Sequence, residues 1–160
     1  MVDVAELNKV EILSIFSEAQ LEELSKIAEK NSYKAMAHIY ERGERAKHLF
    51  IVTKGLVSLR ELKPGDQVGI GFEMRERGEL FGTACFMKPQ EYTLSAVSLE
   101  DSELIAIDAD KLFDLCEKDL DMGYKLMKKI AQVYFERYKV AKRQIREMVK
   151  TPTIITALPG

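Results

Sequence analysis

The chain has 160 residues, of which 46% are hydrophobic and 31% are charged, and its formal net charge at pH 7 is −2. This composition is typical of a globular domain with a sizeable core, and it excludes a disordered chain. The near-neutral charge gives no overall attraction to nucleic acid, and no apolar run reaches the roughly 20 residues that a membrane-spanning helix needs.

The N-terminal segment is expected to be helical over residues 7–32. Ser17 and Gln20 have the spacing of a capping box, in which each side chain accepts a hydrogen bond from the other residue's backbone N–H. Apolar residues then recur on one helical face from Leu21 to Ala28. These features predict amphipathic helices ahead of the rest of the domain.

From residue 33 to residue 107 the hydrophobic period changes to two, which predicts a series of short strands. The Pro64-Gly65-Asp66 turn between two of these segments predicts a hairpin. Many short strands separated by glycine-containing turns favour an antiparallel β-barrel or jelly roll. The expected strands are 33–40, 49–52, 56–61, 67–72, 92–98 and 103–107.

After Asp108, a good N-cap, residues 108–150 are expected to be helical. Apolar residues there recur at alternating spacings of four and three, the pattern of a coiled-coil seam. We expect the front part, 120–130, to pack on the same chain and the back part to pair with a second copy, which predicts a homodimer. The alternative is an amphipathic helix that packs entirely on its own barrel. The seam residues are Met127, Ala131, Tyr134, Tyr138, Ala141, Ile145 and Met148.

The most informative segment of the chain is Gly78-Glu79-Leu80-Phe81-Gly82-Thr83-Ala84-Cys85-Phe86. Its glycines frame a loop that turns sharply and presents successive backbone N–H groups at the start of a short helical turn. Such a group of donors binds anions, phosphate above all. The segment therefore predicts an anion-binding loop between two strands of the barrel.

The order of helices, glycine-punctuated strands, anion loop and long C-terminal helix resembles the cyclic-nucleotide-binding domain family, which includes catabolite activator protein-like sensor domains. The resemblance extends from about residue 7 to residue 150. It implies an α+β, mainly β fold: an antiparallel β-barrel or jelly roll with N-terminal helices and a long C-terminal helix. It also implies one sensor domain over 1–150, with helices at 7–32, the barrel at 33–107 and helices at 108–150, before an extended tail at 151–160. The matching turn glycines are Gly43, Gly55, Gly78 and Gly82.

In this family the loop N–H groups, an arginine and the small residue after it hold the cyclic phosphate, and a glutamate after Phe-Gly holds the ribose. Here Thr83 stands at the glutamate position and Tyr92 at the arginine position. Tyr92 carries no positive charge at neutral pH, and the loss of a charge-assisted contact worth ~1.5–3 kcal/mol weakens binding roughly ten- to a hundredfold. The resemblance implies ligand-binding roles for Phe81, Gly82, Thr83, Ala84, Cys85, Tyr92 and Thr93.

Three interpretations of this pocket are open. It binds a cyclic nucleotide (cAMP or cGMP) weakly, or with Lys88 as a substitute cation; it senses another small molecule, with Phe81, Phe86 and Tyr92 as an aromatic lining; or its own side chains fill it. The last case leaves a protein-interaction and dimerisation scaffold. In the sensor interpretations, ligand binding shifts a hinge near residues 116–121 and repositions the long helix, which acts on an effector domain or a protein partner.

The sequence predicts no enzyme and no metal site, because its two histidines, His38 and His48, do not combine with carboxylates at a ligand spacing. The N-terminus lacks a secretory signal pattern, and Cys85 and Cys116 lie among apolar neighbours. These features predict a cytoplasmic protein with buried, reduced thiols.

A basic stripe on the last helix is expected to be a solvated face beside the seam. The tail is too short for the winged helix that follows this fold in transcription factors, so no nucleic-acid binding is predicted for this chain alone. The stripe consists of Lys139, Lys142, Arg143, Arg146 and Lys150.

Overall fold

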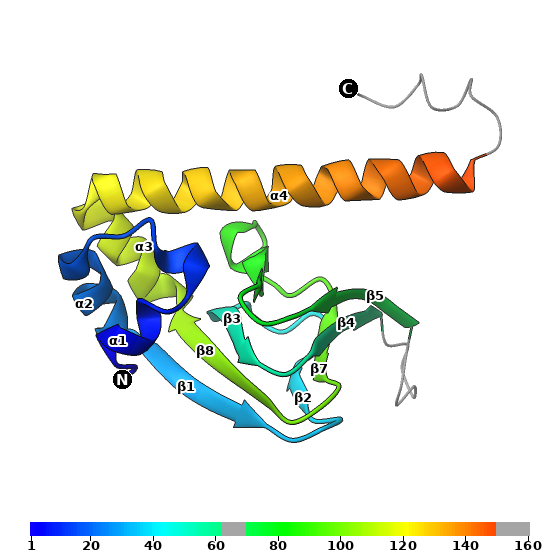
Figure 1. The fold of residues 1–160 in the computed structure, drawn as a ribbon, viewed down its shortest axis with the longest axis horizontal. Helices are drawn as coiled ribbons and strands as arrows, with labels where there is room; N and C mark the ends of the chain where they lie inside the picture. Colours follow the sequence, from blue (N-terminus) through cyan, green and yellow to red (C-terminus); the bar gives the residue numbers. More distant parts are fainter. Residues whose placement is uncertain (62–69, 150–160) are drawn as a thin grey trace. The chain divides into compact units, whose positions relative to one another are not determined.

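The computed structural model describes residues 1–61 and 70–149, and the described residues divide between Gly123 and Tyr124 into two compact units. The first unit carries both β-sheets and the shorter helices, of which α1, α2 and α3 gather at one end of the sheets (Figure 1). The helical elements are α1 (Val4–Leu7), η1 (Glu11–Leu13), α2 (Glu18–Lys26), η2 (Thr83–Phe86), α3 (Ala109–Lys118) and α4 (Leu120–Met148). The strands are β1 (Ala28–Tyr33), β2 (His38–Tyr40), β3 (His48–Lys54), β4 (Val57–Glu61), β5 (Ile70–Arg75), β6 (Leu80–Phe81), β7 (Ser95–Ser98) and β8 (Ser102–Asp108).

The strands form two four-stranded antiparallel sheets. Sheet A has the order β1-β8-β3-β6, and sheet B has the order β2-β7-β4-β5. The chain passes repeatedly from one sheet to the other, which is the jelly-roll arrangement. The predicted fold class, mainly β with flanking helices, is therefore confirmed, and in the described part of the chain the two sheets stay separate rather than closing into one barrel.

The hairpin predicted around residues 64–66 is present as the antiparallel pairing of β4 with β5. In that ladder Val57 lies opposite Arg75 and Leu59 lies opposite Glu73. The turn itself, like the tail at 151–160, lies outside the described residues. The division into a sensor domain at 1–150 and a tail stays a prediction.

The first strand corrects the predicted boundaries. The helical segment ends at Lys26, and residues 28–32, which we expected to be helical, belong to β1, which pairs with β8 from Ala28 opposite Ile107 to Tyr33 opposite Ser102. β1 is a polar edge strand in which Ala28 alone is buried. As an edge strand it has only one neighbouring strand, and its residues show no alternating apolar pattern. Its conformation is therefore decided by the pairing with β8, about 75 residues later in the chain.

The predicted helix starts are confirmed. Ser17 Oγ accepts from Gln20 N at 3.3 Å and Gln20 Oε1 accepts from Ser17 N at 3.1 Å, which completes the capping box. Asp108 caps α3 by accepting from the backbone N–H of Lys111 at 3.0 Å. Among the helices of the described ranges, none is long and apolar enough to cross a membrane.

The corner between α3 and α4 falls where a hinge was predicted. The Gln20 side-chain amide donates to Asp119 Oδ2 at 2.9 Å and to Asp121 Oδ2 at 3.0 Å. Asp119 also accepts from the backbone N–H of Met122 at 3.0 Å, and this bond is the main reason that the pKa of its carboxyl lies below the usual value. The corner is thus attached to α2 through one glutamine.

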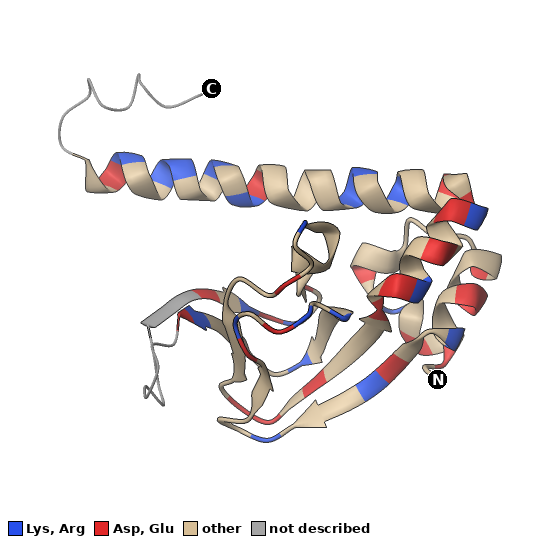
Figure 2. Ribbon diagram, turned by 180° about the vertical axis from the view of Figure 1, so that it is seen from behind, with Lys and Arg blue, Asp and Glu red and all other residues tan. Residues whose placement is uncertain are grey.

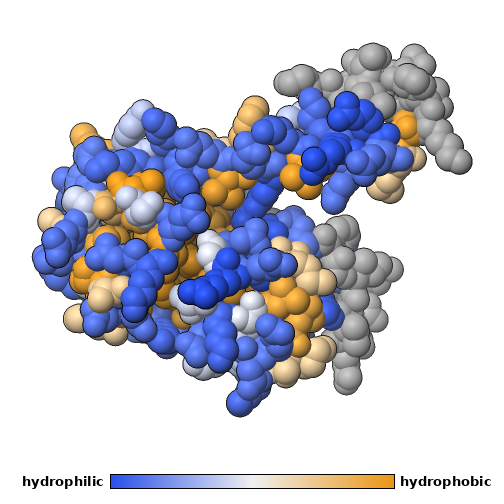
Figure 3. Space-filling view, in the orientation of Figure 1, coloured by the Kyte–Doolittle hydropathy of each residue, from blue (hydrophilic) through white to orange (hydrophobic). Residues whose placement is uncertain are grey.

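All seven seam residues lie on α4, a single helix of 29 residues. Their larger side chains are exposed, including Met127, Tyr134, Tyr138 and Ile145. Figure 3 shows hydrophobic side chains reaching the surface along this helix among hydrophilic ones, and Figure 2 shows basic residues concentrated in its C-terminal half. The apolar row is thus exposed on the single chain, and the pairing of α4 with a second copy stays a prediction.

Candidate functional site

The anion loop has the predicted shape. β6 leads into Gly82, whose φ of +78° is left-handed, and η2 follows directly as a short 3₁₀ turn. A Cβ on residue 82 would lie 2.8 Å from His48 O and 3.1 Å from a ring carbon of Phe50. Both the backbone angle and the lack of space therefore require glycine at the point where the loop turns.

Tyr92, the residue at the position of the family's arginine, is buried. Its hydroxyl donates to His48 O at 3.0 Å and accepts from His48 N at 3.2 Å. Its ring stacks on Tyr40 with 3.6 Å between centroids. Burial raises the pKa of the Tyr92 hydroxyl to about 12, so the side chain is a neutral part of the core.

An aromatic cluster of four rings fills the space beside the loop. Phe50 stacks on Phe81 at 5.0 Å between centroids, and Tyr40 lies 5.8 Å from Phe50 and 6.1 Å from Phe81. Tyr92 completes the cluster through its stack on Tyr40. Two predicted site residues, Phe81 and Tyr92, are thus brought together, but as packed rings that also contact their neighbours in both sheets.

The other predicted site residues differ in exposure. Cys85 is buried, Thr83 and Ala84 are half-buried, and Thr93 is exposed. Lys88, considered as a substitute cation, is also exposed, and the Phe86 ring contacts Phe113 of α3 rather than the cluster, at 5.4 Å between centroids. The structure therefore keeps the loop together but does not show Thr93 or Lys88 directed into a common pocket.

Cys85 is expected to be chemically inert in the folded protein. Burial raises the pKa of its thiol from 9.0 to about 12, so the reactive thiolate is roughly a thousandfold rarer than in a free cysteine. Alkylation of the native protein below pH 9 should modify the half-buried Cys116 first, and Cys85 only after denaturation. Fast native labelling of Cys85, measured by peptide mass spectrometry, would contradict this.

The same shift fixes the sign of a pH effect. Because the folded pKa of Cys85 lies above the unfolded value, its stabilising effect is complete below pH 9 and is lost as the pH rises from 9 towards 12. The free energy of unfolding of the wild type should therefore fall relative to that of Cys85→Ala by up to about 1.4 kcal/mol per pH unit in this range. If the free energies of unfolding of the two proteins differed by the same amount throughout this pH range, the thiol would be accessible to water in the folded protein.

One buried charged residue was missed by the sequence analysis. Arg75, at the end of β5, is only 7% exposed, and it forms an ion pair with Glu73 two residues earlier. From the sequence, an arginine in a short strand is expected to lie on the surface. Only the strand register, which places it opposite the fully buried Val57, reveals its burial.

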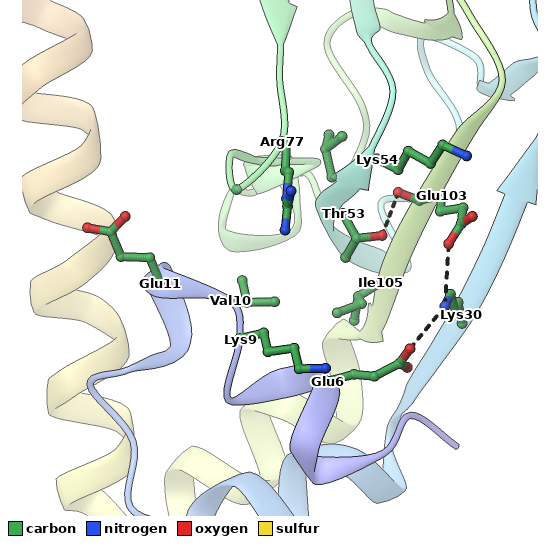
Figure 4. Close-up of a pocket in the computed structure, with 12 residues that line it drawn as sticks. Glu6, Lys9, Val10, Glu11, Lys30, Thr53, Lys54, Arg77, Glu103 and Ile105 are labelled. Atoms are coloured by element: carbon green, nitrogen blue, oxygen red, sulfur yellow. Dashed lines mark hydrogen bonds and ion pairs between the residues drawn. The ribbon is translucent and has the colours of Figure 1, made fainter.

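A separate cleft of about 520 Å³ lies on the other face of sheet A (Figure 4). Ile105 lines the cleft and lies opposite Ile51, so both side chains point to the same face of sheet A. Phe50, the neighbour of Ile51, points to the opposite face, because successive side chains of a strand alternate. The cleft and the aromatic cluster are therefore on opposite faces. Lys30 bridges Glu6 at 3.0 Å and Glu103 at 3.3 Å, and these two carboxylates raise its pKa. The cleft is therefore separate from the aromatic cluster, although Gly78, the first residue of the anion-loop segment, also lines it.

The histidines have other roles. His38 Nδ1 pairs with the carboxylate of Glu41, and the backbone of His48 holds Tyr92. Within the described ranges, no three His, Cys, Asp or Glu side chains gather in a way that would hold a metal ion.

Residues 30–119 match the family model of the cyclic nucleotide-binding domain, so the chain belongs to that family. No curated protein matches the chain.

Solved structures agree on the fold. The chain is similar to a Geobacter metallireducens GS-15 protein named for cyclic nucleotide binding, with 22% identity over 86% of this chain and 99% of the other, and a TM-score of 0.76. It is similar to the sensor domain of the transcriptional regulator DNR from Pseudomonas aeruginosa, with 20% identity over 83% and 89% of the two chains and a TM-score of 0.67. A third similar structure is the regulatory domain of Toxoplasma gondii PKA with cAMP, with 17% identity over 81% and 48% and a TM-score of 0.63. At these identities the likeness concerns the fold alone.

Proposed function

We propose that this chain is a regulatory domain without catalytic activity, which senses a small molecule beside the anion loop. The observation that carries the proposal is the retained turn at Gly82, left-handed and followed at once by η2, within the jelly roll of a family named for ligand binding. A glycine that tolerates no Cβ and leads into a 3₁₀ turn is a costly feature for a loop that only connects two strands.

The packing around Tyr92 argues against a cyclic nucleotide as the tight-binding ligand. The ring stacks in the core and its hydroxyl is bonded to the His48 backbone, so it neither contributes a charge nor is free to turn towards a phosphate. Thr83 replaces the family's longer carboxylate at the ribose position. We therefore favour an effector other than cAMP or cGMP, whereas the weakly bound nucleotide is the second interpretation.

Calorimetric titration with cAMP and with cGMP tests this choice. A lost charge-assisted contact worth ~1.5–3 kcal/mol lowers affinity by roughly ten- to a hundredfold, so neither nucleotide should saturate the protein at low micromolar concentration. Saturation in that range by either nucleotide would overturn our preference and establish a nucleotide sensor. A matched non-cyclic control, 5′-AMP, separates specific binding from general attraction of phosphate.

The output of the domain is proposed to pass through α4 to a second copy of the chain and from there to an effector domain or protein partner. The supporting observation is the row of exposed apolar side chains on α4, together with basic residues that stack on its rings: Arg137 lies 5.3 Å from the Tyr134 centroid and Lys142 lies 5.3 Å from the Tyr138 centroid. Such flanking cations are typical of the edges of a helix pair.

A filled, ligand-free scaffold is the remaining candidate, and the four-ring cluster favours it. Thermal-shift screening separates it from a sensor. A sensor gains stability with one class of small molecule through binding to the folded state, whereas a scaffold gains none.

A further inference from the structure

The register of the strands places Arg75 on the inner face of sheet B. Tyr40 is opposite Ala96, Ala96 is opposite Leu59, and Leu59 is opposite Glu73, so these four side chains form one row across the sheet. Tyr40 contacts rings of sheet A, so the row faces the space between the sheets. Arg75 is two residues after Glu73 on the same strand and therefore points to the same side.

The exposures of Met74 and Arg75 agree with an inward orientation of Arg75. Met74 is 53% exposed, whereas Arg75 is 7% exposed, as expected when successive residues of an edge strand point outward and inward. The turn after Arg75 is tight, with Glu79 N donating to Glu76 O at 3.0 Å, and it leads directly into β6 and the anion loop. The buried guanidinium is thus on the strand that immediately precedes this loop.

The hydrogen bonds of Arg75 are incomplete. One terminal nitrogen, Nη1, donates to Met74 O at 2.7 Å, and the other, Nη2, pairs with the Glu73 carboxylate. The remaining donor, Nε, is buried and has no partner among the described residues. Buried donors are nearly always satisfied in folded proteins, and an unsatisfied one costs about 1–3 kcal/mol.

The unpartnered Nε and the adjacent Nη2 lie on one edge of the Arg75 guanidinium, and this edge can bind an anion. Nε and Nη2 of an arginine point in parallel and fit the two oxygens of a carboxylate or phosphate. Glu73, whose carboxylate now pairs with the Nη2 end of this edge, has a side chain that is 47% exposed, so it can turn to water when another anion arrives.

We propose that Arg75 holds the anionic group of the effector, which is a small organic anion that enters between the sheets from the β5 edge. This inference rests on the proposed sensing function and adds the ligand class and the residue that recognises it. Glu73 acts as a displaceable counterion that occupies the guanidinium in the ligand-free domain. The positive charge that Tyr92 does not supply is thus supplied by Arg75 on β5.

The test follows the Nε–H group of Arg75 by ¹H–¹⁵N NMR while the protein is titrated with inorganic phosphate and, separately, with benzoate, an aromatic carboxylate. We expect a saturable shift of this resonance with at least one of the two. Glu73→Gln should tighten binding several-fold because the competing carboxylate is gone. Arg75→Lys, which keeps the charge but loses the paired donors, should weaken it about tenfold.

Controls separate this inference from a structural role and from the proposed function. Arg77→Lys changes an exposed arginine two residues away and should leave binding unchanged. Arg75→Met should fold, because the Glu73 carboxylate that loses its partner is 47% exposed and can be hydrated, and near-ultraviolet circular dichroism checks the packing of the variant.

No saturable shift with either anion, or unchanged binding in both Arg75 variants, overturns the role of Arg75 and leaves water as the partner of Nε. If backbone resonances of residues 82–85 shift while Arg75 stays silent, the sensor proposal stands and this inference alone fails.

Discussion

Replacing Gly55 with alanine is expected to lower the free energy of unfolding by about 3–4 kcal/mol. Gly55 has a φ of +91°, and a Cβ there would overlap Ser102 Oγ and lie 2.7 Å from Ser102 Cα. Ser102 is buried and central to a small network: its hydroxyl accepts from Leu56 N at 3.2 Å and donates to Glu100 O at 2.8 Å. The substitution therefore adds backbone strain and also displaces a backbone atom and a bonded hydroxyl.

Gly43 provides the matched control. Its φ of +87° is nearly the same, but nothing lies within 4 Å of a Cβ built on it, so Gly43→Ala should cost only the strain of the left-handed backbone, about 1–2 kcal/mol. Urea unfolding of the two variants measures the difference directly. Equal losses would show that Ser102 moves aside freely and that the contact carries no energy.

Replacing Tyr138 and Ile145 together with glutamate is expected to convert a dimer into a monomer. Both residues belong to the seam, and both are 42% exposed on the single chain. In a paired helix the substitutions would bury carboxylates on both copies, at a cost of several kcal/mol for each, which raises the dissociation constant by at least roughly a thousandfold. Sedimentation velocity at micromolar concentration measures the change.

The control adds the same charge outside the seam. Gln132 and Gln144 are exposed on the same helix, and their replacement with glutamate should leave the oligomeric state unchanged. A wild-type chain that already sediments as a monomer at tens of micromolar would refute the dimer. So would a double seam variant that remains dimeric.

Much of the fold follows from local signals in the sequence. Ser17 and Asp108 start helices because their side chains cap backbone N–H groups a few residues away, and such contacts need no knowledge of the rest of the chain. The turn glycines are predictable for the same reason: Gly43, Gly55, Gly78 and Gly82 all have positive φ. β1 was missed because nothing in its own polar residues specifies a strand.

The site depended on long-range contacts and was therefore only partly predictable. The turn at Gly82 is local, and the left-handed glycine and the short helical turn after it are present as predicted. The environment of Tyr92 comes from His48, 44 positions earlier, and from Tyr40, so its role in the core is not visible in the residues around it. The burial of Arg75 likewise results from the pairing of β5 with β4.

The close stack of Tyr40 on Tyr92 has a practical consequence. The chain contains six tyrosines and no tryptophan, so no stronger chromophore masks the signal of this fixed pair. Rigid aromatic neighbours give near-ultraviolet circular dichroism that disappears when their packing loosens. The unlabelled protein thus carries its own optical reporter, next to the loop where we propose that an effector binds.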